Sequence, residues 1–196
     1  PLWIPGISGT ALQFGQTPGD HNFVVIQHDS LLDLTRNWSF TAWVRLDHHE
    51  SHHGIYGGLF FCNNYSVQMG SDGDPQMYFW PSDITGNWQF GMNVEPPLGQ
   101  WHHLAFTYDG EVFITYMDGA PVFYRTGLPA SLNTSAYIPW DYLFIGCYYE
   151  SDLQRWFSGA IDEFSVWNEV LSAAQIHTIM THGVTAVSYT HLTLPT

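Results

Sequence analysis

Several side chains in one short stretch could bind a metal ion. His48, His49, His52 and His53 lie close to Glu50 in the sequence. Imidazole nitrogens and a carboxylate are suitable ligands for Zn²⁺ or Cu²⁺. The stretch is predicted to be a loop, which would not by itself fix a tetrahedral geometry. A solvated loop whose histidines gain charge as the pH falls through about 6.5 is therefore the alternative.

Aromatic side chains are the second group that could do chemistry, and they make up 17% of the chain. Aromatic rings stack on the apolar faces of sugars, while Asn, Asp and Gln hydrogen-bond the sugar hydroxyls. The same rings could instead cover the edges of a hydrophobic core. The candidate ligand-binding residues are Tyr78, Trp80, Trp88, Trp140, Tyr142, Tyr148, Tyr149 and Trp156.

The charge of the chain limits its partners. The sequence has 18 acidic residues, four arginines and no lysine, which gives a formal net charge of -14. Nucleic acids and anionic membrane surfaces need clustered cations, so neither is an expected partner. No apolar stretch approaches the 18 or so residues that a membrane-spanning helix needs, so no membrane insertion is expected. Cations and neutral polar ligands such as sugars remain open.

The two cysteines, Cys62 and Cys147, leave two alternatives. They could form one disulfide bond, or they could be two buried thiols. The sequence does not decide between them.

The elements that would position these residues are predicted to be strands. Short apolar runs alternate with Gly, Pro, Asn and Asp every 8 to 12 residues or so, which is typical of a sandwich or barrel. The predicted strands are Ala11–Phe14, Phe23–Ile26, Ser39–Arg45, Gly58–Phe61, Ser66–Met69, Met77–Trp80, Trp88–Gly91, Trp101–Tyr108, Val112–Met117, Pro121–Tyr124, Leu143–Ile145 and Ala160–Trp167. The expected fold is all-β, a two-sheet antiparallel β-sandwich.

Local signals refine this expectation. Asp-Gly pairs at Asp109 and Asp118 predict tight turns, so residues 101–124 should form a three-stranded meander. Ser172 and Gln175 have the spacing of a capping box, which predicts one short C-terminal helix. In the strand around Trp43, Phe40, Ala42 and Val44 should face the core.

The two ends of the chain are expected to lie outside the domain. Residues 1–10 are predicted to be a lead-in, 11–180 a single domain and 181–196 a tail. Residues 187–196 resemble a translated sequencing adapter and are expected to be non-native. The chain is expected to be a fragment of a longer protein with covalently linked neighbouring domains.

Three segments, Ala11–Asp47, Gly99–Val122 and Leu143–Ile176, carry a family resemblance. The first contains Ser-Phe-Thr-Ala-Trp-Val, the second two Asp-Gly hairpins, and the third Gly-Ala-Ile-Asp-Glu before the predicted helix. Together and in this order they resemble the laminin-G-like jelly-roll domains of the concanavalin A-like lectin and glucanase superfamily. The resemblance implies two curved antiparallel sheets and a domain that binds glycans or proteins.

The resemblance also implies a structural Ca²⁺ ion where the first turn meets the closing strand. This nominates Asp20 and Asp162, with backbone carbonyls near Gly15 and Gly159. The alternative is that Asp20 stabilises a turn and that Asp162 hydrogen-bonds backbone groups at the sheet edge.

The resemblance argues against catalysis. Glucanases of the superfamily carry Glu-x-Asp-x-x-Glu on one strand, and here Ala160 and Ser165 occupy the positions of the two glutamates around Asp162. Related lyases carry Gln-Ile-His on a strand, whereas Gln175–His177 falls in the predicted helix.

The sequence thus predicts a non-catalytic binding module of a larger extracellular or cell-surface protein, with a polysaccharide or glycan as ligand. The alternatives are an adhesion or spacer module that contacts protein partners, and a divergent polysaccharide hydrolase or lyase.

Overall fold

The structure is a computed structural model that describes residues 1–15, 21–27, 32, 34–48, 56–62, 65–70, 75–79, 88–91, 96–128, 142–150, 153–184 and 191–193. Within these ranges the backbone alone is described for 56–57, 61–62, 65, 69–70, 75–79, 88–91, 149–150, 153–155 and 191–193. Within the described residues no helix is both long enough and apolar enough to cross a membrane.

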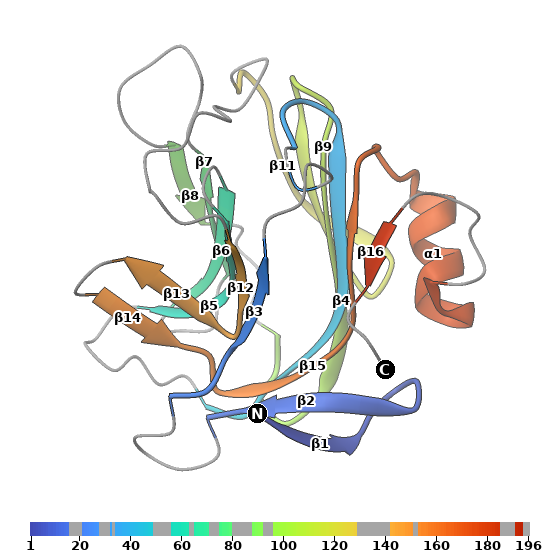
Figure 1. Ribbon diagram of the computed structural model, residues 1–196. Helices are drawn as coiled ribbons and strands as arrows, with labels where there is room; N and C mark the ends of the chain where they lie inside the picture. Colours follow the sequence, from blue (N-terminus) through green and yellow to red (C-terminus); the bar gives the residue numbers. More distant parts are fainter. Residues whose placement is uncertain are drawn as a thin grey trace.

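Two antiparallel sheets face each other (Figure 1). The large sheet has the order β1 (Leu2–Pro5), β2 (Thr10–Phe14), β15 (Gly159–Trp167), β4 (Trp38–Leu46), β9 (Trp101–Tyr108), β10 (Phe113–Met117) and β11 (Ala120–Arg125), and β16 (His191–Thr193) also pairs with β15. The small sheet has the order β3 (Val24–Gln27), β12 (Tyr142–Ile145), β5 (Tyr56–Cys62), β6 (Tyr65–Gly70), β7 (Pro75–Phe79) and β8 (Trp88–Gly91). A separate hairpin joins β13 (Cys147–Glu150) to β14 (Leu153–Trp156).

The main core lies between the two sheets. Alternate residues of β4 enter it, as the sequence pattern predicts: Phe40, Ala42 and Val44 are buried there. The ring of Phe40 stacks on that of Phe60 from β5, with the ring centres 4.5 Å apart. Because β4 and β5 belong to different sheets, this contact joins the two layers directly.

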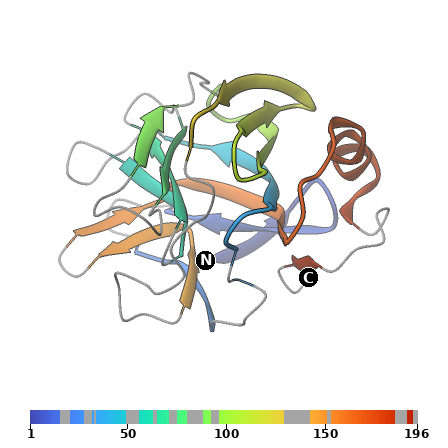
Figure 2. The ribbon, with the colours of Figure 1, turned by 90° about the horizontal axis from the view of Figure 1, so that it is seen from above.

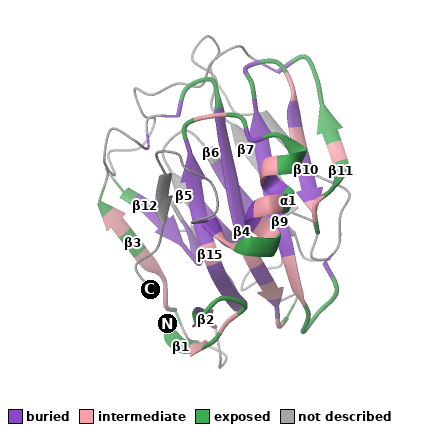
Figure 3. Ribbon diagram, turned by 90° about the vertical axis from the view of Figure 1, so that its right-hand side faces the viewer, coloured by how far each residue is buried: buried purple, intermediate pink, exposed green. Residues whose placement is uncertain are grey.

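A second apolar cluster lies on the outer face of the large sheet. Helix α1 (Ala173–His182) packs there (Figure 3). Its buried Ile176 and Ile179 belong to one cluster with Ala105 and Trp167 of the sheet. The predicted capping box at Ser172 is confirmed, since its hydroxyl accepts the Gln175 N–H and the Gln175 side chain accepts the Ser172 N–H. Figures 1 and 2 place α1 and the β13–β14 hairpin on opposite sides of the sandwich.

Most of the predicted architecture is confirmed. All twelve predicted strands are present with small shifts at their ends, and the meander is β9, β10 and β11. Four strands are additional. Residues 1–10, expected as a lead-in, supply β1 at the edge of the large sheet, and β16 lies in the segment expected to be non-native. The β13–β14 hairpin packs outside the two sheets, where its residues do not need the alternation that marks a core strand.

Candidate functional site

A run of aromatic rings lies on the outer face of the small sheet at its β3 edge. Val24 and Ile26 of β3 pack against the core, as do Leu143 and Ile145 of the neighbouring β12. Because successive strand residues point to opposite faces, the residues between them lie on the outer face. We name the resulting ring set the ring platform; its members are His21, Phe23, Tyr142, Phe144 and Trp156.

The rings of the platform form a continuous path. His21 stacks on Trp156 with ring centres 4.6 Å apart and an angle of 10°. Phe23 lies 5.5 Å from Trp156 and 6.0 Å from Phe144, and Phe144 lies 6.1 Å from Tyr142. Tyr142 is 39% exposed, so the series ends in a ring that a ligand can reach. Phe144 is only 5% exposed and supports its neighbours, whereas the flat rings that stay partly exposed can stack on apolar faces of a ligand.

The residues beside the open end add both apolar and polar surface. Val25, which pairs with Phe144, is 45% exposed. Gln27 is exposed and pairs with Tyr142 across the strands. An amide next to an exposed ring can both donate and accept hydrogen bonds, so this end of the platform combines stacking with hydrogen bonding.

The β13–β14 hairpin supplies Trp156 and lies directly on β5. At Gly58 a side chain is excluded, because a Cβ atom there would lie 2.0 Å from the backbone nitrogen of Tyr148. Tyr148 itself is buried, and Cys147 is a buried free thiol whose pKa burial raises to about 12. The close approach at Gly58 therefore fixes the hairpin, and with it Trp156, against the sheet.

The structure brings together three of the predicted ligand-binding residues. Tyr142 and Trp156 belong to the ring platform, and Tyr148 packs beneath it with Phe144. The others are placed elsewhere or lie outside the described side chains. Tyr78 and Trp88 belong to β7 and β8 at the opposite edge of the small sheet, the Tyr149 backbone is in β13, and Trp80 and Trp140 lie outside the described residues.

Three of the nominated calcium ligands, Gly15, Gly159 and Asp162, are among the described residues. Gly15 and Gly159 are close, since Gly159 pairs with Phe14, and their carbonyls accept hydrogen bonds from Ser158 and Gln13. Asp162 lies three residues further along β15, which is about 10 Å at the rise of an extended strand. Asp20 lies outside the described residues. The calcium hypothesis therefore stays a prediction.

The Asp162 carboxylate accepts hydrogen bonds from backbone N–H groups. Its Oδ2 accepts from Ile7 at 2.7 Å and Ser8 at 2.9 Å, and its Oδ1 accepts from Glu163 at 2.9 Å. The carboxylate thus closes the turn between β1 and β2, which is the alternative that the sequence left open.

The rest of the Gly-Ala-Ile-Asp-Glu motif also has structural roles. At Gly159 a Cβ atom would lie 2.0 Å from the Arg45 carbonyl oxygen. Glu163 has a φ of 51° in a bulge of β15, and its carboxylate accepts the Val184 N–H after helix α1. The motif thus joins β15 to the N-terminal hairpin and to the helix.

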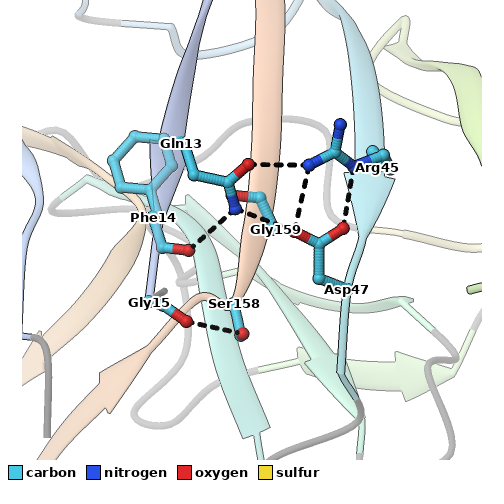
Figure 4. A network of polar contacts seen from close by, with 7 residues as sticks. All are labelled: Gln13, Phe14, Gly15, Arg45, Asp47, Ser158 and Gly159. Carbon is cyan, nitrogen blue, oxygen red and sulfur yellow. Dashed lines mark hydrogen bonds and ion pairs between the residues drawn. The ribbon is translucent and has the colours of Figure 1, made fainter. Parts of the chain in front are cut away.

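A polar network lies on the outer face of the large sheet near its end (Figure 4). Arg45 donates from Nε to Asp47 Oδ1 at 2.7 Å, and from Nη2 to Asp47 Oδ2 at 3.1 Å and Gln13 Oε1 at 2.7 Å. Gln13 Nε2 donates to Asp47 Oδ2 at 2.8 Å and to the Gly159 carbonyl. Ala160 lies between Gln13 and Arg45 in the register, and its small side chain lets them meet.

The network shifts the titration of both charged groups. Burial raises the pKa of Asp47, but the hydrogen bonds from Arg45 and Gln13 and the nearby positive charge outweigh it, so the pKa lies below its ordinary value. The hydrogen bond to Asp47 raises the pKa of Arg45. Both groups are therefore charged at neutral pH, and their charges cancel.

Two neighbouring histidines of β9 have different environments. His102 Nδ1 lies 2.8 Å from Asp118 Oδ2, and Asp118 Oδ1 accepts the backbone N–H of His103. The His103 side chain is only 1% exposed, its ring meets Trp43 edge to face, and its Nδ1 has no hydrogen-bond partner within the described part of the chain. Burial lowers the pKa of His103 to about 4, although the charge of Asp118 acts in the opposite direction.

The predicted histidine cluster falls largely outside the described residues, which include only His48. Among the residues that the structure does describe, no group of three or more His, Cys, Asp or Glu side chains could hold a metal ion. The Zn²⁺ or Cu²⁺ hypothesis therefore stays a prediction.

Sequence reasoning missed several residues of these sites. His21, Phe23 and Phe144 join the ring platform through the pairing of β3 with β12, and no local pattern indicates that pairing. Arg45 and Asp47 had a usable signal, since residues two apart in a strand share a face and an Arg between core residues must point outward.

Solved structures share this architecture. Domain 4 of AbnA, a GH43 extracellular arabinanase from Geobacillus stearothermophilus in complex with arabinotriose, is 21% identical with a TM-score of 0.67 over 91% of this chain and 80% of that one. The IT-sialidase CBM40 from Ruminococcus gnavus, bound to alpha2,3 sialyllactose, is 12% identical with a TM-score of 0.65 over 91% and 96%. A putative carbohydrate binding protein from Bacteroides ovatus is 15% identical with a TM-score of 0.66 over 87% and 46%.

At these identities the structural similarity establishes the fold. A comparison with curated proteins finds no match. A laminin G-type family profile described as the Concanavalin A-like lectin/glucanases superfamily matches residues 18–177, which is most of the chain. The chain therefore belongs to the concanavalin A-like lectin/glucanases superfamily.

Proposed function

We propose that this chain is a non-catalytic carbohydrate-binding module of a larger extracellular or cell-surface protein. The observation that carries the proposal is the ring platform, which ends in the exposed Tyr142 beside Val25 and Gln27. Aromatic rings bind the apolar face of a sugar, and the Gln27 amide supplies hydrogen bonds for its hydroxyls.

Two further observations support the proposal. Structures similar in fold include one in complex with arabinotriose and one bound to alpha2,3 sialyllactose. On β15, the Asp162 carboxylate accepts hydrogen bonds from three backbone N–H groups. Ala160 and Ser165 occupy the positions of the two catalytic glutamates of the glucanases. This strand therefore lacks the pair of carboxylates that a retaining glycosidase needs.

The test is affinity electrophoresis of the full chain through gels that contain arabinan, mixed-linkage glucan, galactomannan, alginate or pectin. We expect retardation by at least one neutral polysaccharide, with no release of reducing sugar from the same material. Each gel is run with Ca²⁺ and with a chelator, because loss of retardation in the chelator would add a calcium ion to the site.

Two variants locate the site. Tyr142→Ala should weaken the retardation about tenfold, since it removes the open ring of the platform. Tyr124→Ala is the matched control, because Tyr124 is 74% exposed on β11 of the other sheet and its loss should change nothing. Retardation equal in both variants would move the site away from the platform. No retardation by any polysaccharide would favour a module that contacts proteins.

A further inference from the structure

The outer face of the large sheet carries a second group of aromatic and polar side chains, beside helix α1. Arg45 pairs with Trp101 across β4 and β9, and in the next row Trp43 pairs with His103. Trp43 and Trp101 are half-buried and occupy diagonal positions, which brings large side chains within reach of each other. The Arg45 guanidinium lies over the Trp101 ring, 5.4 Å from its centre.

Arg45 is fixed by hydrogen bonds and still has one nitrogen that can donate. Its hydrogen bonds to Asp47 and Gln13 involve Nε and Nη2, and Nη1 makes no hydrogen bond to the described residues (Figure 4). The side chain is 23% exposed. A guanidinium fixed by three hydrogen bonds and a ring loses little freedom when it binds a ligand, which favours binding.

The ion pair leaves one donor and one acceptor available, on opposite sides of the guanidinium (Figure 4). Nη1 can donate, and among the described residues Asp47 Oδ1 accepts only the Arg45 Nε–H, so it retains a lone pair. The hydroxyls of a sugar can bind at both positions, because each hydroxyl both donates and accepts. Because the two charges cancel and the chain carries a net charge of -14, the matching ligand is neutral.

We infer that Trp43, Arg45, Asp47 and Trp101 form a second site for a neutral saccharide, on the face of the sandwich opposite the ring platform. The half-buried tryptophans contact the apolar face of the sugar, and Arg45 Nη1 and Asp47 Oδ1 each bind a hydroxyl. One chain then holds two polysaccharide strands and cross-links them. The cross-linking rests on the proposed function of the platform, whereas the second site does not.

The first experiment measures cross-linking. A chain shown to be monomeric by light scattering is mixed with the neutral polysaccharide that retards it most, and turbidity is recorded. Wild type and the control Tyr124→Ala should form a turbid network. Trp43→Ala should lose the network while it keeps retardation in the gel, and Tyr142→Ala should lose the network as well. Melting curves for each variant verify that it is folded.

The second experiment is calorimetry of the wild-type chain with a short oligosaccharide cut from the same polysaccharide. Two molecules should bind per chain, falling to one in Trp43→Ala, with affinity at the second site reduced about tenfold or more. One molecule per chain in the wild type, with retardation intact, overturns this inference and leaves the platform standing. Two molecules per chain that Tyr142→Ala does not change overturn the platform instead. No binding at all overturns both.

Discussion

Acid should destabilise this domain through one buried histidine. His103 is 1% exposed, and the ring nitrogen Nδ1 has no partner among the described residues. Its pKa is lowered by burial to about 4, against about 6.5 for an exposed histidine. The unfolded chain therefore binds a proton more readily than the folded chain between these two pH values, so stability falls as the pH drops from 6.5 to 4.

The size of the effect follows from the shift in pKa. Each unit corresponds to about 1.4 kcal/mol, so the difference between about 6.5 and about 4 amounts to about 3 kcal/mol of unfolding free energy. For a domain of this length about 1 kcal/mol moves the melting temperature by about 2 to 4 °C. We therefore expect His103 to lower it by about 6 to 12 °C at pH 4. Above pH 6.5 the histidine is neutral in both states and contributes no pH dependence.

The assay compares urea denaturation curves from pH 4 to pH 7 for wild type and His103→Phe, which keeps a flat ring against Trp43 but cannot be protonated. Other groups titrate in both proteins, so the difference between the two curves isolates His103. The control His177→Phe replaces an exposed helix histidine and should follow the wild type. Parallel curves for wild type and His103→Phe, or an imidazole that titrates near pH 6.5 by NMR, would refute the reasoning.

Three further predictions concern the contacts that shape the sites. Gly58→Ala should destabilise the fold by about 3 kcal/mol in urea, because the new Cβ would meet the backbone of Tyr148, and an unchanged midpoint would mean that the hairpin does not lie on β5. Asp47→Asn should cost about 1 to 3 kcal/mol at pH 7, since it leaves Arg45 without its anion. The pKa of Asp47 lies below its ordinary value, so this stabilisation is complete above about pH 4 and is lost as the pH falls further. Wild type and Asp47→Asn should thus converge in acid, and a constant gap would contradict the ion pair. Asp162→Ala should lower the melting temperature equally in Ca²⁺ and in chelator, whereas a loss seen only in Ca²⁺ would restore a metal ligand there.

The fold was largely predictable because the core strands follow a period of two. Phe40, Ala42 and Val44 alternate with residues that face outward, and this alternation can be recognised without knowing which strands are neighbours. The edge strand β1 lacks that signal, since Leu2 and Trp3 are both exposed. Local rules thus identify the core strands and the edge strands β3, β8 and β11, and they miss β1, whose exposed residues do not alternate.

The candidate sites were less predictable because they depend on which strands are neighbours. The sequence indicates Tyr142 only by its ring, and its partner Gln27 comes from a strand that is far away in the sequence. The family resemblance indicates Asp162, whose carboxylate accepts hydrogen bonds from the turn at Ile7 and Ser8. Composition indicates the chemistry available, whereas only the pairing order shows which side chains meet.

The position of β4 has a consequence for how this domain folds. It lies between β9 and β15, and the Ser39 hydroxyl donates to the Glu169 carbonyl and accepts the Leu171 N–H, across 130 and 132 residues of sequence. During synthesis β4 can pair with β9 once Tyr108 has been made, but the hydrogen bonds on its other side can form only after β15 has been made. Contacts so distant in sequence slow folding, to milliseconds or seconds in all-β domains. Until β15 has emerged from the ribosome, one side of β4 remains an unpaired edge that could join another chain.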